Sequence, residues 1–275
     1  MTARVHPSAI VHEGAVLGPG VEVGAYCIVG AQAKIGGGTR LISHVSIPGR
    51  VTAGVENVFH PFTVIASEPQ DVKDKGENAE VVIGDRNTFR EGVTVNRGTR
   101  KGGGRTTIGS DCYLMTGSHV GHDCVVADHV TLVNAAALGG HVEVQDFAYL
   151  SAHAAAHQFA TIGRHAFVAG ASRITVDAPP YMLTHGEDHD VIAVNAVGLK
   201  RHGFAPDAIN ALKEAHRVIW ASGLPLPDAI RTLKKMFDGH YKEVDFLIDF
   251  MQSTAKGKNG RARETLRNLP VPGSV

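Results

Sequence analysis

The sequence is poor in cysteine, carries no surplus charge and contains no long apolar run. Three cysteines in 275 residues are too few, and odd in number, for a disulfide framework. The 27 basic side chains are matched by 27 acidic ones, which argues against a nucleic-acid-binding protein because such proteins need a surplus of Lys and Arg. The first 14 residues lack the apolar segment of a signal peptide, and no run of about 18 apolar residues follows. We therefore expect a cytoplasmic protein with no transmembrane segment and no nucleic-acid partner.

Aromatic residues are also scarce, at 6% of the chain, whereas there are 32 glycines. Aliphatic residues recur with a period of six over residues 5–65 and 83–95 and, one residue out of phase, over residues 108–180. Of these 27 positions, 22 are Val, Ile or Leu. A period of six is neither that of an α-helix nor that of a single strand. It predicts short parallel strands joined by sharp corners, with one aliphatic side chain per strand pointing inward.

Three such strands make a coil of 18 residues, and we expect the coils to stack about 4.8 Å apart as a solenoid. All three cysteines, Cys27, Cys112 and Cys124, fall at the fifth position of the repeat, which also points inward. We interpret them as small buried apolar residues rather than as metal ligands or nucleophiles.

Two interruptions break the repeat, over residues 66–81 and 99–106. Both are polar and charged, so we expect them to leave the solenoid at its corners, either as functional loops or as tolerated surface insertions. After residue 180, amphipathic patterns beginning at Pro206 and Pro227 and a third around Val244 predict three helices that cover the open end of the solenoid. The basic tail from residue 253 to 275 is expected to be loose.

One cluster of polar residues lies where the repeat predicts an outward corner. His122 occupies the third position of its repeat, and Gly140 occupies the same corner one coil later. Asp123 lies below His141 in the same way. A carboxylate beside a histidine holds one tautomer of the ring, and a glycine above it leaves a backbone N–H exposed to a developing oxyanion. These residues are suited to histidine-assisted acyl transfer to an alcohol, without a nucleophile from the protein.

The period of six resembles the hexapeptide-repeat family, whose members form left-handed parallel β-helices and usually assemble as trimers. More specific strings resemble the UDP-N-acetylglucosamine acyltransferase family, which performs the first step of lipid A biosynthesis. They are PQDVK, IGDRN, VTVNRGT, HVGHDC, GGH, HQF and NAVGLKRHGF. The resemblance implies an all-β solenoid, a left-handed parallel β-helix over residues 1–190, followed by a C-terminal three-helix domain over residues 191–275. It further implies a homotrimer that uses acyl carrier protein and a UDP-sugar as substrates, with no cofactor and no metal.

Roles for individual residues follow from the same resemblance. His122 would be the general base, Asp123 would orient it, and the N–H of Gly140 would hold the oxyanion. The expected sugar contacts are His119, His141, Gln70, Asp71 and Lys73. The expected nucleotide contacts are His157, Gln158, Asn195 and Arg201. Gly170 would set the length of the acyl groove, and its lack of a side chain predicts a long 3-hydroxyacyl chain.

Four positions depart from the usual pattern of the family: Asn96, Asp188, Val197 and His202. Val197 and His202 leave the nucleotide contacts open, whereas Asn96 and Asp188 leave open which sugar and which acyl chain are selected. The choice between UDP-N-acetylglucosamine and its 3-amino analogue as acceptor therefore stays open. Three other functions also stay open at this point. These are a related sugar acetyltransferase that uses acetyl-CoA, a zinc-dependent γ-type carbonic anhydrase with His119, His122 and His141 as ligands, and a non-catalytic scaffold.

Overall fold

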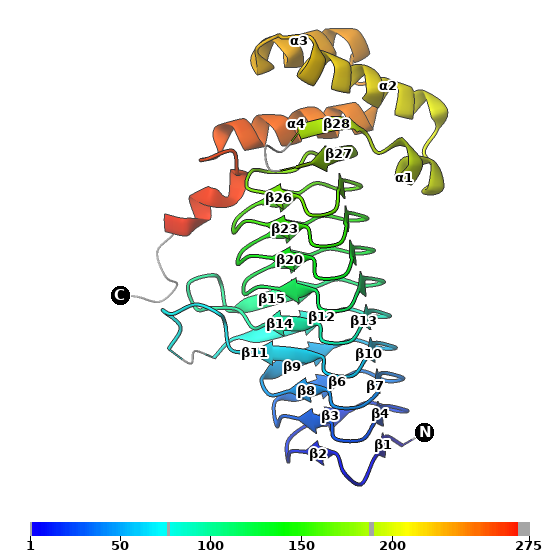
Figure 1. Ribbon diagram of the computed structural model, residues 1–275, viewed down its shortest axis with the longest axis vertical. Helices are drawn as coiled ribbons and strands as arrows, with labels where there is room; N and C mark the ends of the chain where they lie inside the picture. Colours follow the sequence, from blue (N-terminus) through cyan, green and yellow to red (C-terminus); the bar gives the residue numbers. More distant parts are fainter. Residues whose placement is uncertain (1, 76–77, 187–189, 269–275) are drawn as a thin grey trace.

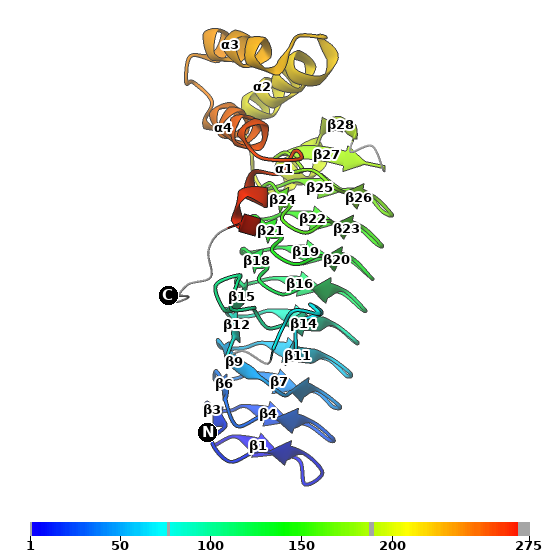
Figure 2. The same cartoon turned by 90° about the vertical axis from the view of Figure 1, so that its left-hand side faces the viewer.

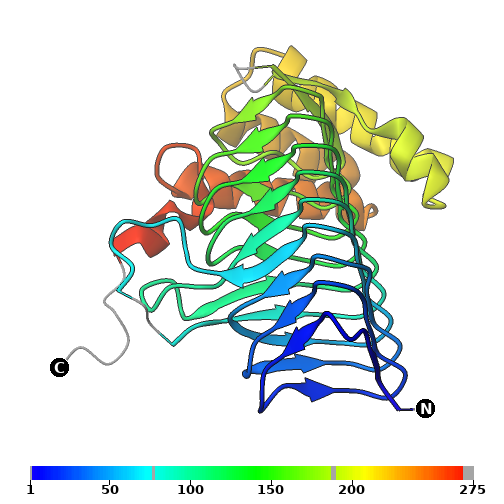
Figure 3. The same ribbon diagram turned by 60° about the horizontal axis from the view of Figure 1, so that its bottom comes forward.

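The computed structural model describes residues 2–75, 78–186 and 190–268, and shows a three-sided prism of stacked coils with helices at its C-terminal end (Figure 1). Seen toward the N-terminal end, the prism is triangular (Figure 3). Each coil adds one short strand to each of three sheets, and strands 18 residues apart pair in parallel where no loop intervenes, as Thr131 does with Tyr149.

The three sheets are numbered here in the order in which the chain meets them. Sheet 1 has eleven strands: β1 (Arg4–Val5), β4 (Glu22–Val23), β7 (Arg40–Leu41), β10 (Val58–Phe59), β13 (Thr88–Phe89), β16 (Tyr113–Leu114), β19 (Thr131–Leu132), β22 (Tyr149–Leu150), β25 (Phe167–Val168), β27 (Met182–His185) and β28 (Asp190–Val194). Sheet 2 has nine: β2 (Ile10–Val11), β5 (Ile28–Val29), β8 (Ser46–Ile47), β11 (Val64–Ser67), β14 (Thr94–Asn96), β17 (His119–Val120), β20 (Ala137–Leu138), β23 (Ala155–Ala156) and β26 (Arg173–Ile174). Sheet 3 has eight: β3 (Val16–Leu17), β6 (Ala33–Ile35), β9 (Arg50–Ala53), β12 (Glu80–Ile83), β15 (Arg105–Ile108), β18 (Val125–Val126), β21 (Glu143–Val144) and β24 (Thr161–Ile162).

The period of six predicted the core of the prism correctly. Every repeat position from Val23 to Ile174 is buried, and burial of one such side chain is worth about 1.5–3 kcal/mol. Val5, in the first coil, is 46% exposed because no coil packs beneath it. The three cysteines are buried and unpaired, as expected. Burial raises the pKa of Cys112 and of Cys124 to about 12, so neither thiol is ionised at neutral pH.

The corners place residues 18 apart directly over one another. At the corner between sheets 2 and 3, Asp123, His141 and Phe159 all have positive φ angles, of 60°, 63° and 66°. Such a conformation costs an L-residue roughly 1–2 kcal/mol, which the stacked core offsets. The repeated conformation aligns their side chains in one column.

Both interruptions leave the prism at this same corner, between β11 and β12 and between β14 and β15. The two loops are called here the first and second excursions. The first excursion spans residues 68–79 and is two residues shorter at each end than the expected range, and the second excursion spans residues 97–104, two residues earlier than expected. Residues 76–77 lie outside the described part of the chain. Arg97 and Asp74 form an almost buried ion pair of 3.0 Å that joins one excursion to the other.

The C-terminal part contains α1 (Ala196–Arg201), α2 (Pro206–His216), η1 (Arg217–Ala221), α3 (Leu226–Phe237), α4 (Lys242–Lys256) and η2 (Ala262–Asn268). Helices α2, α3 and α4 are the three that the sequence predicts, and they share a core with β27 and β28. Strand β28 lies across the expected boundary between residues 190 and 191, so this division into two domains stays a prediction.

The expectation of a loose tail from residue 253 is wrong for the part that the structure describes. Ser253–Lys256 is the end of α4, and η2 packs against the side of the prism (Figure 2). Asp177 on the last coil holds this segment, because its Oδ2 accepts hydrogen bonds from Thr254 Oγ1 at 3.0 Å and from the N–H of Ala262 at 2.8 Å. These anchoring contacts come from a distant part of the chain, and a basic composition does not reveal them. Residues 269–275 lie outside the described part.

Candidate active site

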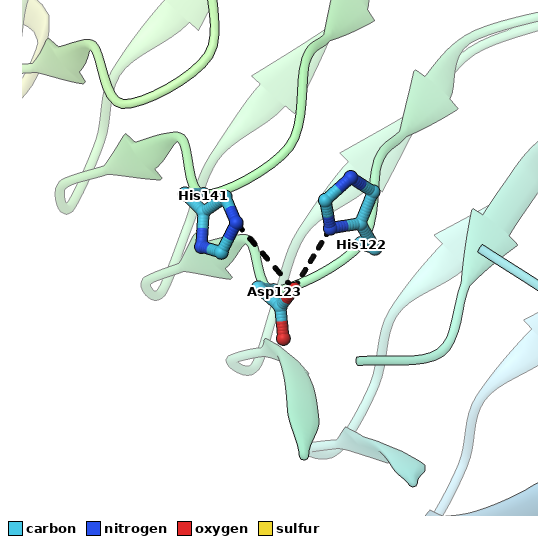
Figure 4. Close-up of side chains that lie close together, drawn as sticks. All are labelled: His122, Asp123 and His141. Atoms are coloured by element: carbon cyan, nitrogen blue, oxygen red, sulfur yellow. Dashed lines mark hydrogen bonds and ion pairs between the residues drawn. The ribbon is translucent and has the colours of Figure 1, made fainter. Parts of the chain in front are cut away.

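His122 and Asp123 lie together at the corner between β17 and β18 (Figure 4). The Nδ1 atom of His122 is 2.8 Å from Oδ2 of Asp123, whose side chain is only 1% exposed. Because a carboxylate only accepts hydrogen bonds, Nδ1 must carry the proton, and the outer atom Nε2 is then a proton acceptor. The pair therefore has the arrangement of a histidine general base with its orienting carboxylate.

The second excursion closes over the carboxylate of Asp123. Thr99 donates to it twice, from its N–H at 2.8 Å and from its hydroxyl at 2.7 Å. The N–H of Asp123 donates in turn to the hydroxyl of Thr106 at 2.8 Å. A Cβ at Gly102 would be only 2.0 Å from the carboxyl carbon of Asp123, so the excursion needs a glycine here. The sequence analysis assigns no role to Thr99, Gly102 or Thr106. The glycine run of the second excursion is the sequence signal that could have drawn attention to this loop.

Gly140 lies one coil above His122, as the repeat predicts. A Cβ at this position would be 2.5 Å from Cε1 and from Nε2 of the imidazole, so any side chain would displace the ring. Among the backbone hydrogen bonds of residues 2–75, 78–186 and 190–268, the N–H groups of Gly139 and His141 have partners, and that of Gly140 has none. This N–H can therefore donate to a ligand oxygen, which is the requirement for an oxyanion donor.

Two further histidines flank the pair. His141 Nε2 is 3.7 Å from Asp123 Oδ2, and its ring stacks on Phe159 with centroids 4.3 Å apart. Burial lowers the pKa of His141 to about 4, although the charge of Asp123 opposes the shift. His119 contacts the hydroxyl of Thr94 through Nδ1 at 2.8 Å, and burial, with a smaller effect from His122, lowers its pKa as well. Both rings are neutral at neutral pH and suited to binding uncharged hydroxyl groups.

His122 lines two grooves. The larger, of about 710 Å³, is lined by charged, polar and apolar residues: Gln70, Asp71, Lys73, Lys101, Gly102, Gly103, Arg105, His122, Asp123, Val125, His141, Gln158, Phe159, Arg263, Leu266 and Arg267. The smaller, of about 290 Å³, is lined mainly by small residues: Gln70, Asn96, His119, Gly121, His122, Ala137, Leu138, Gly139, Gly140, Ala155 and Ala156. The structure thus gathers nine of the predicted site residues around one histidine: Gln70, Asp71, Lys73, His119, His122, Asp123, Gly140, His141 and Gln158.

Four predicted residues line neither groove. His157 faces the carbonyl of Gln158, which its Nδ1 approaches to 2.9 Å. Asn195 caps α1 by accepting from the N–H of Gly198, and its amide donates to the carbonyl of His165. Arg201 lines a separate pocket on α1. These last two lie near the corner between sheets 3 and 1, whereas His122 lies between sheets 2 and 3.

Gly170, the fourth, is exposed at the corner between β25 and β26, on the opposite edge of sheet 2 from His122. Of the positions that depart from the family pattern, Asn96 is buried and donates to Ser67 and to the carbonyl of Glu68, which ties down the start of the first excursion. Val197 and His202 lie on and just after α1. Asp188 lies outside the described residues.

Within the described residues, one group of three side chains has donor atoms close enough for a metal ion: His122, Asp123 and His141, within 4.8 Å of one another. However, Oδ2 of Asp123 already accepts hydrogen bonds from Thr99 and His122. The set of His119, His122 and His141 that a zinc enzyme would need is not gathered, because His119 is not part of this group. The geometry fits proton transfer better than metal binding.

Comparison with known proteins links this geometry to a family. A family model described as UDP N-acetylglucosamine O-acyltransferase, domain 2, matches residues 177–259. The acyl-[acyl-carrier-protein]–UDP-N-acetylglucosamine O-acyltransferase of Syntrophobacter fumaroxidans is 42% identical over 255 residues, which cover 92% of this chain and 98% of the relative. The enzyme of the same name from Anaeromyxobacter is 42% identical over 211 residues, 77% of this chain and 82% of the relative.

Solved structures give the same result for the fold. The UDP-N-acetylglucosamine acyltransferase of Bacteroides fragilis superimposes with a TM-score of 0.86 at 32% identity, covering 90% of this chain and 96% of the other. The corresponding enzyme of Moraxella catarrhalis gives 0.85 at 36% identity with the same coverage. The predicted left-handed parallel β-helix with C-terminal helices is confirmed.

Proposed function

Since the chain belongs to the UDP-N-acetylglucosamine O-acyltransferase family, we propose that His122 is the general base that activates the acceptor hydroxyl of the sugar. The protein transfers an acyl chain from acyl carrier protein to UDP-N-acetylglucosamine, the first step of lipid A biosynthesis. We take the acceptor to be the 3-hydroxyl and the acyl group to be a 3-hydroxyacyl chain. The main observation in support of this proposal is the hydrogen bond between His122 and Asp123, with Gly140 directly above the His122 ring.

The proposed reaction needs no covalent intermediate with the protein. Nε2 of His122 removes the proton of the 3-hydroxyl while the oxygen attacks the thioester carbonyl. The tetrahedral oxyanion accepts a hydrogen bond from the N–H of Gly140, and the buried carboxylate of Asp123 stabilises the imidazolium. When the intermediate collapses, the C–S bond breaks, and the thiolate of the carrier takes the proton from His122.

The two grooves divide the substrates in this proposal. The acyl chain lies in the smaller groove, where Ala137 and Ala155 leave an apolar strip above His119. The sugar lies in the larger groove beside Gln70, Asp71 and Lys73. The reacting atoms then meet at His122, which with Gln70 is one of the two residues that line both grooves.

We also propose a homotrimer. In one chain the expected nucleotide residues Asn195 and Arg201 are at a different corner from His122, so a second subunit is needed to bring them to the same substrate. A column of neighbouring rings, Tyr26, His44 and Phe62, is exposed at another corner, with Tyr26 and Phe62 each 63% exposed. Light scattering at micromolar concentration should give three times the chain mass of 29.1 kDa, and a stable monomer would exclude this assembly.

Among the described residues, no helix is both long and apolar enough to cross a bilayer. We propose that the protein acts in the cytoplasm, where an acyl carrier protein and a nucleotide sugar are both available to it. Its three free, buried cysteines agree with a reducing compartment.

The direct test uses purified protein with UDP-N-acetylglucosamine and 3-hydroxyacyl carrier protein, and detects the O-acylated sugar nucleotide by mass spectrometry. We expect product with this donor and none with acetyl-CoA, and we expect activity to survive a metal chelator. Product from acetyl-CoA alone would make the protein an acetyltransferase instead. Faster turnover of the 3-amino analogue than of UDP-N-acetylglucosamine would identify the analogue as the acceptor.

A further inference from the structure

The C-terminal segment 257–268 forms one wall of the larger groove, and we propose that Arg263 and Arg267 on it bind the diphosphate of the sugar nucleotide. This inference rests on the proposed function, because it takes UDP-N-acetylglucosamine as the ligand. The matched family model ends at residue 259, so the two arginines lie beyond the segment that it describes.

The segment is built into the fold rather than attached loosely. Besides the hydrogen bonds to Asp177, Arg261 pairs with Glu264 at 2.7 Å, and both side chains are less than one-tenth exposed. Arg261 also donates to the carbonyl of Thr175 on the last coil. A Cβ at Gly260 would be 2.7 Å from the side chain of Val176, which shows how closely the segment is packed against the prism. These contacts fix where η2 begins.

From this anchored start, η2 runs along the corner column of Asp123, His141 and Phe159, and its two arginines lie beside that column. Arg263 donates through Nε to the carbonyl of His141 at 3.2 Å, and its Nη1 is 2.6 Å from a carboxylate oxygen of Glu143. The guanidinium carbon of Arg267 is 4.9 Å from the centre of the Phe159 ring. His141 and Phe159 are on the first and second coils above His122, so both guanidinium groups contact coils within about 10 Å of it at the strand spacing.

The charge of the groove suits an anion. Five basic side chains line it, Lys73, Lys101, Arg105, Arg263 and Arg267, against two acidic ones, Asp71 and Asp123. Asp123 is covered by the second excursion and bonded to His122. The carboxylates that pair with Arg263 and Arg267 are Glu143 and Glu264, and neither belongs to the groove lining. A guanidinium has five N–H donors, so an ion pair that orients it leaves donors for a phosphate oxygen.

Both substrates contain phosphate groups, and the position of the two arginines indicates which substrate's phosphate they bind. In the sugar nucleotide the diphosphate is on C1 and the reacting hydroxyl on C3 of the same ring. When that hydroxyl is at His122, the diphosphate must lie nearby. The phosphate of the carrier's prosthetic arm is instead separated from the thioester by a long chain. Residues one and two coils from His122 therefore suit the diphosphate.

The experiment compares Arg267→Ala and Arg263→Gln with Arg231→Ala in the full-length protein. Arg231 is a matched control, because it pairs with an acid three residues away, as Arg267 does, but lies on α3. We expect each groove variant to raise the KM and the dissociation constant for UDP-N-acetylglucosamine about tenfold or more, the usual effect of losing a hydrogen bond between charged groups. The KM for the acyl carrier protein should not change. Inorganic pyrophosphate should compete with the sugar nucleotide less well in the groove variants than in the control.

Binding is measured by calorimetry as well as kinetics, so the result does not depend on turnover. Unchanged affinity for the sugar nucleotide in both groove variants would overturn the proposal even if the protein is fully active. A higher KM for the carrier alone would assign the arginines to the donor and would also overturn it. If Arg263→Gln unfolds, Arg267→Ala decides, and Arg267→Lys should recover part of the affinity because it keeps the charge without the planar fork. An unaltered protein that binds the sugar nucleotide but makes no product would contradict the proposed function and leave this site intact.

Discussion

Thr99 donates two hydrogen bonds to the carboxylate of Asp123, from its backbone N–H at 2.8 Å and from its hydroxyl at 2.7 Å. The two residues belong to different structures, a loop that leaves the prism and a corner of the next coil. Together with the bond from His122 they satisfy the carboxylate and set the direction in which it faces. The second excursion therefore positions Asp123, the hydrogen-bond partner of His122, which we propose as the general base.

Thr99→Val should lower kcat about tenfold or more, because a hydrogen bond to a charged group is lost and Asp123 can rotate away from His122. The KM for the sugar should change little. Thr99→Ser keeps the hydroxyl and should recover most of the activity, and steady-state kinetics of the three proteins check this. Equal kcat values would show that the backbone N–H alone positions the carboxylate.

His122→Ala should remove nearly all turnover, since general-base catalysis is worth about 10²–10⁴-fold. The fold should be kept, because the ring is outside the hydrophobic core of the prism. His12→Ala, an exposed histidine of the first coil, serves as the control and should retain full activity. A His122→Ala protein that loses its cooperative thermal transition would mean that the residue is structural.

Gly140→Ala should inactivate the enzyme by a steric route. The new Cβ would be 2.5 Å from the imidazole of His122 and must push it away from its position above Asp123. We expect a loss of about 10²-fold or more in kcat, comparable with removal of an oxyanion donor, and about 1–3 kcal/mol in stability from overpacking. Near-normal kcat in this variant would show that the ring can move and still accept the proton.

The open position at Gly170 predicts a preference for long donors. A Cβ added here would meet its nearest atom at 3.4 Å, so a larger side chain can be introduced without a backbone clash. Each buried methylene contributes about 0.8 kcal/mol, so four extra carbons should favour a fourteen-carbon over a ten-carbon 3-hydroxyacyl chain about 100-fold. Gly170→Met should reverse this preference in a competition between the two carrier-bound donors. If the unaltered protein selects the shorter chain, Gly170 is not at the end of the groove.

Stability should decrease as the pH falls from about 6.5 to about 4. Burial lowers the pKa of both His141 and His165 to about 4, whereas an unfolded histidine titrates near 6.5. Within this window the unfolded chain binds more protons than the folded chain. For each of the two histidines, the free energy of unfolding should therefore fall by up to about 1.4 kcal/mol for each unit that the pH is lowered, and it should not change above pH 6.5.

Asp177 acts in the opposite direction, because burial raises the pKa of its carboxyl group, so a variant is needed to isolate the histidine effect. Urea unfolding between pH 7.5 and 4.5 should show a smaller slope for His165→Gln than for the unaltered protein. His12→Gln should leave the slope unchanged. Identical slopes for all three proteins would contradict the prediction for His165.

The sequence by itself determined the prism and the composition of its corner. A period of six determines which side chains point into the prism, because each coil can bury its aliphatic residues only against neighbouring coils of the same length. The same period places residues 18 apart at one corner, which is why the sequence alone predicts that His122 and Gly140 stack. The inward position of Cys124 follows from the same count.

The tertiary structure alone decided what surrounds that corner. The contact of Thr99 with Asp123 and that of Arg263 with Glu143 each join a segment that follows no repeat to a residue of the prism. A period predicts contacts only between equivalent positions of neighbouring coils. Whether a loop or a tail folds back depends on the particular donors and acceptors that it meets there. For the tail these were the buried carboxylate of Asp177 and a stack of aromatic rings, so a segment that looked loose from its composition became a wall of the site.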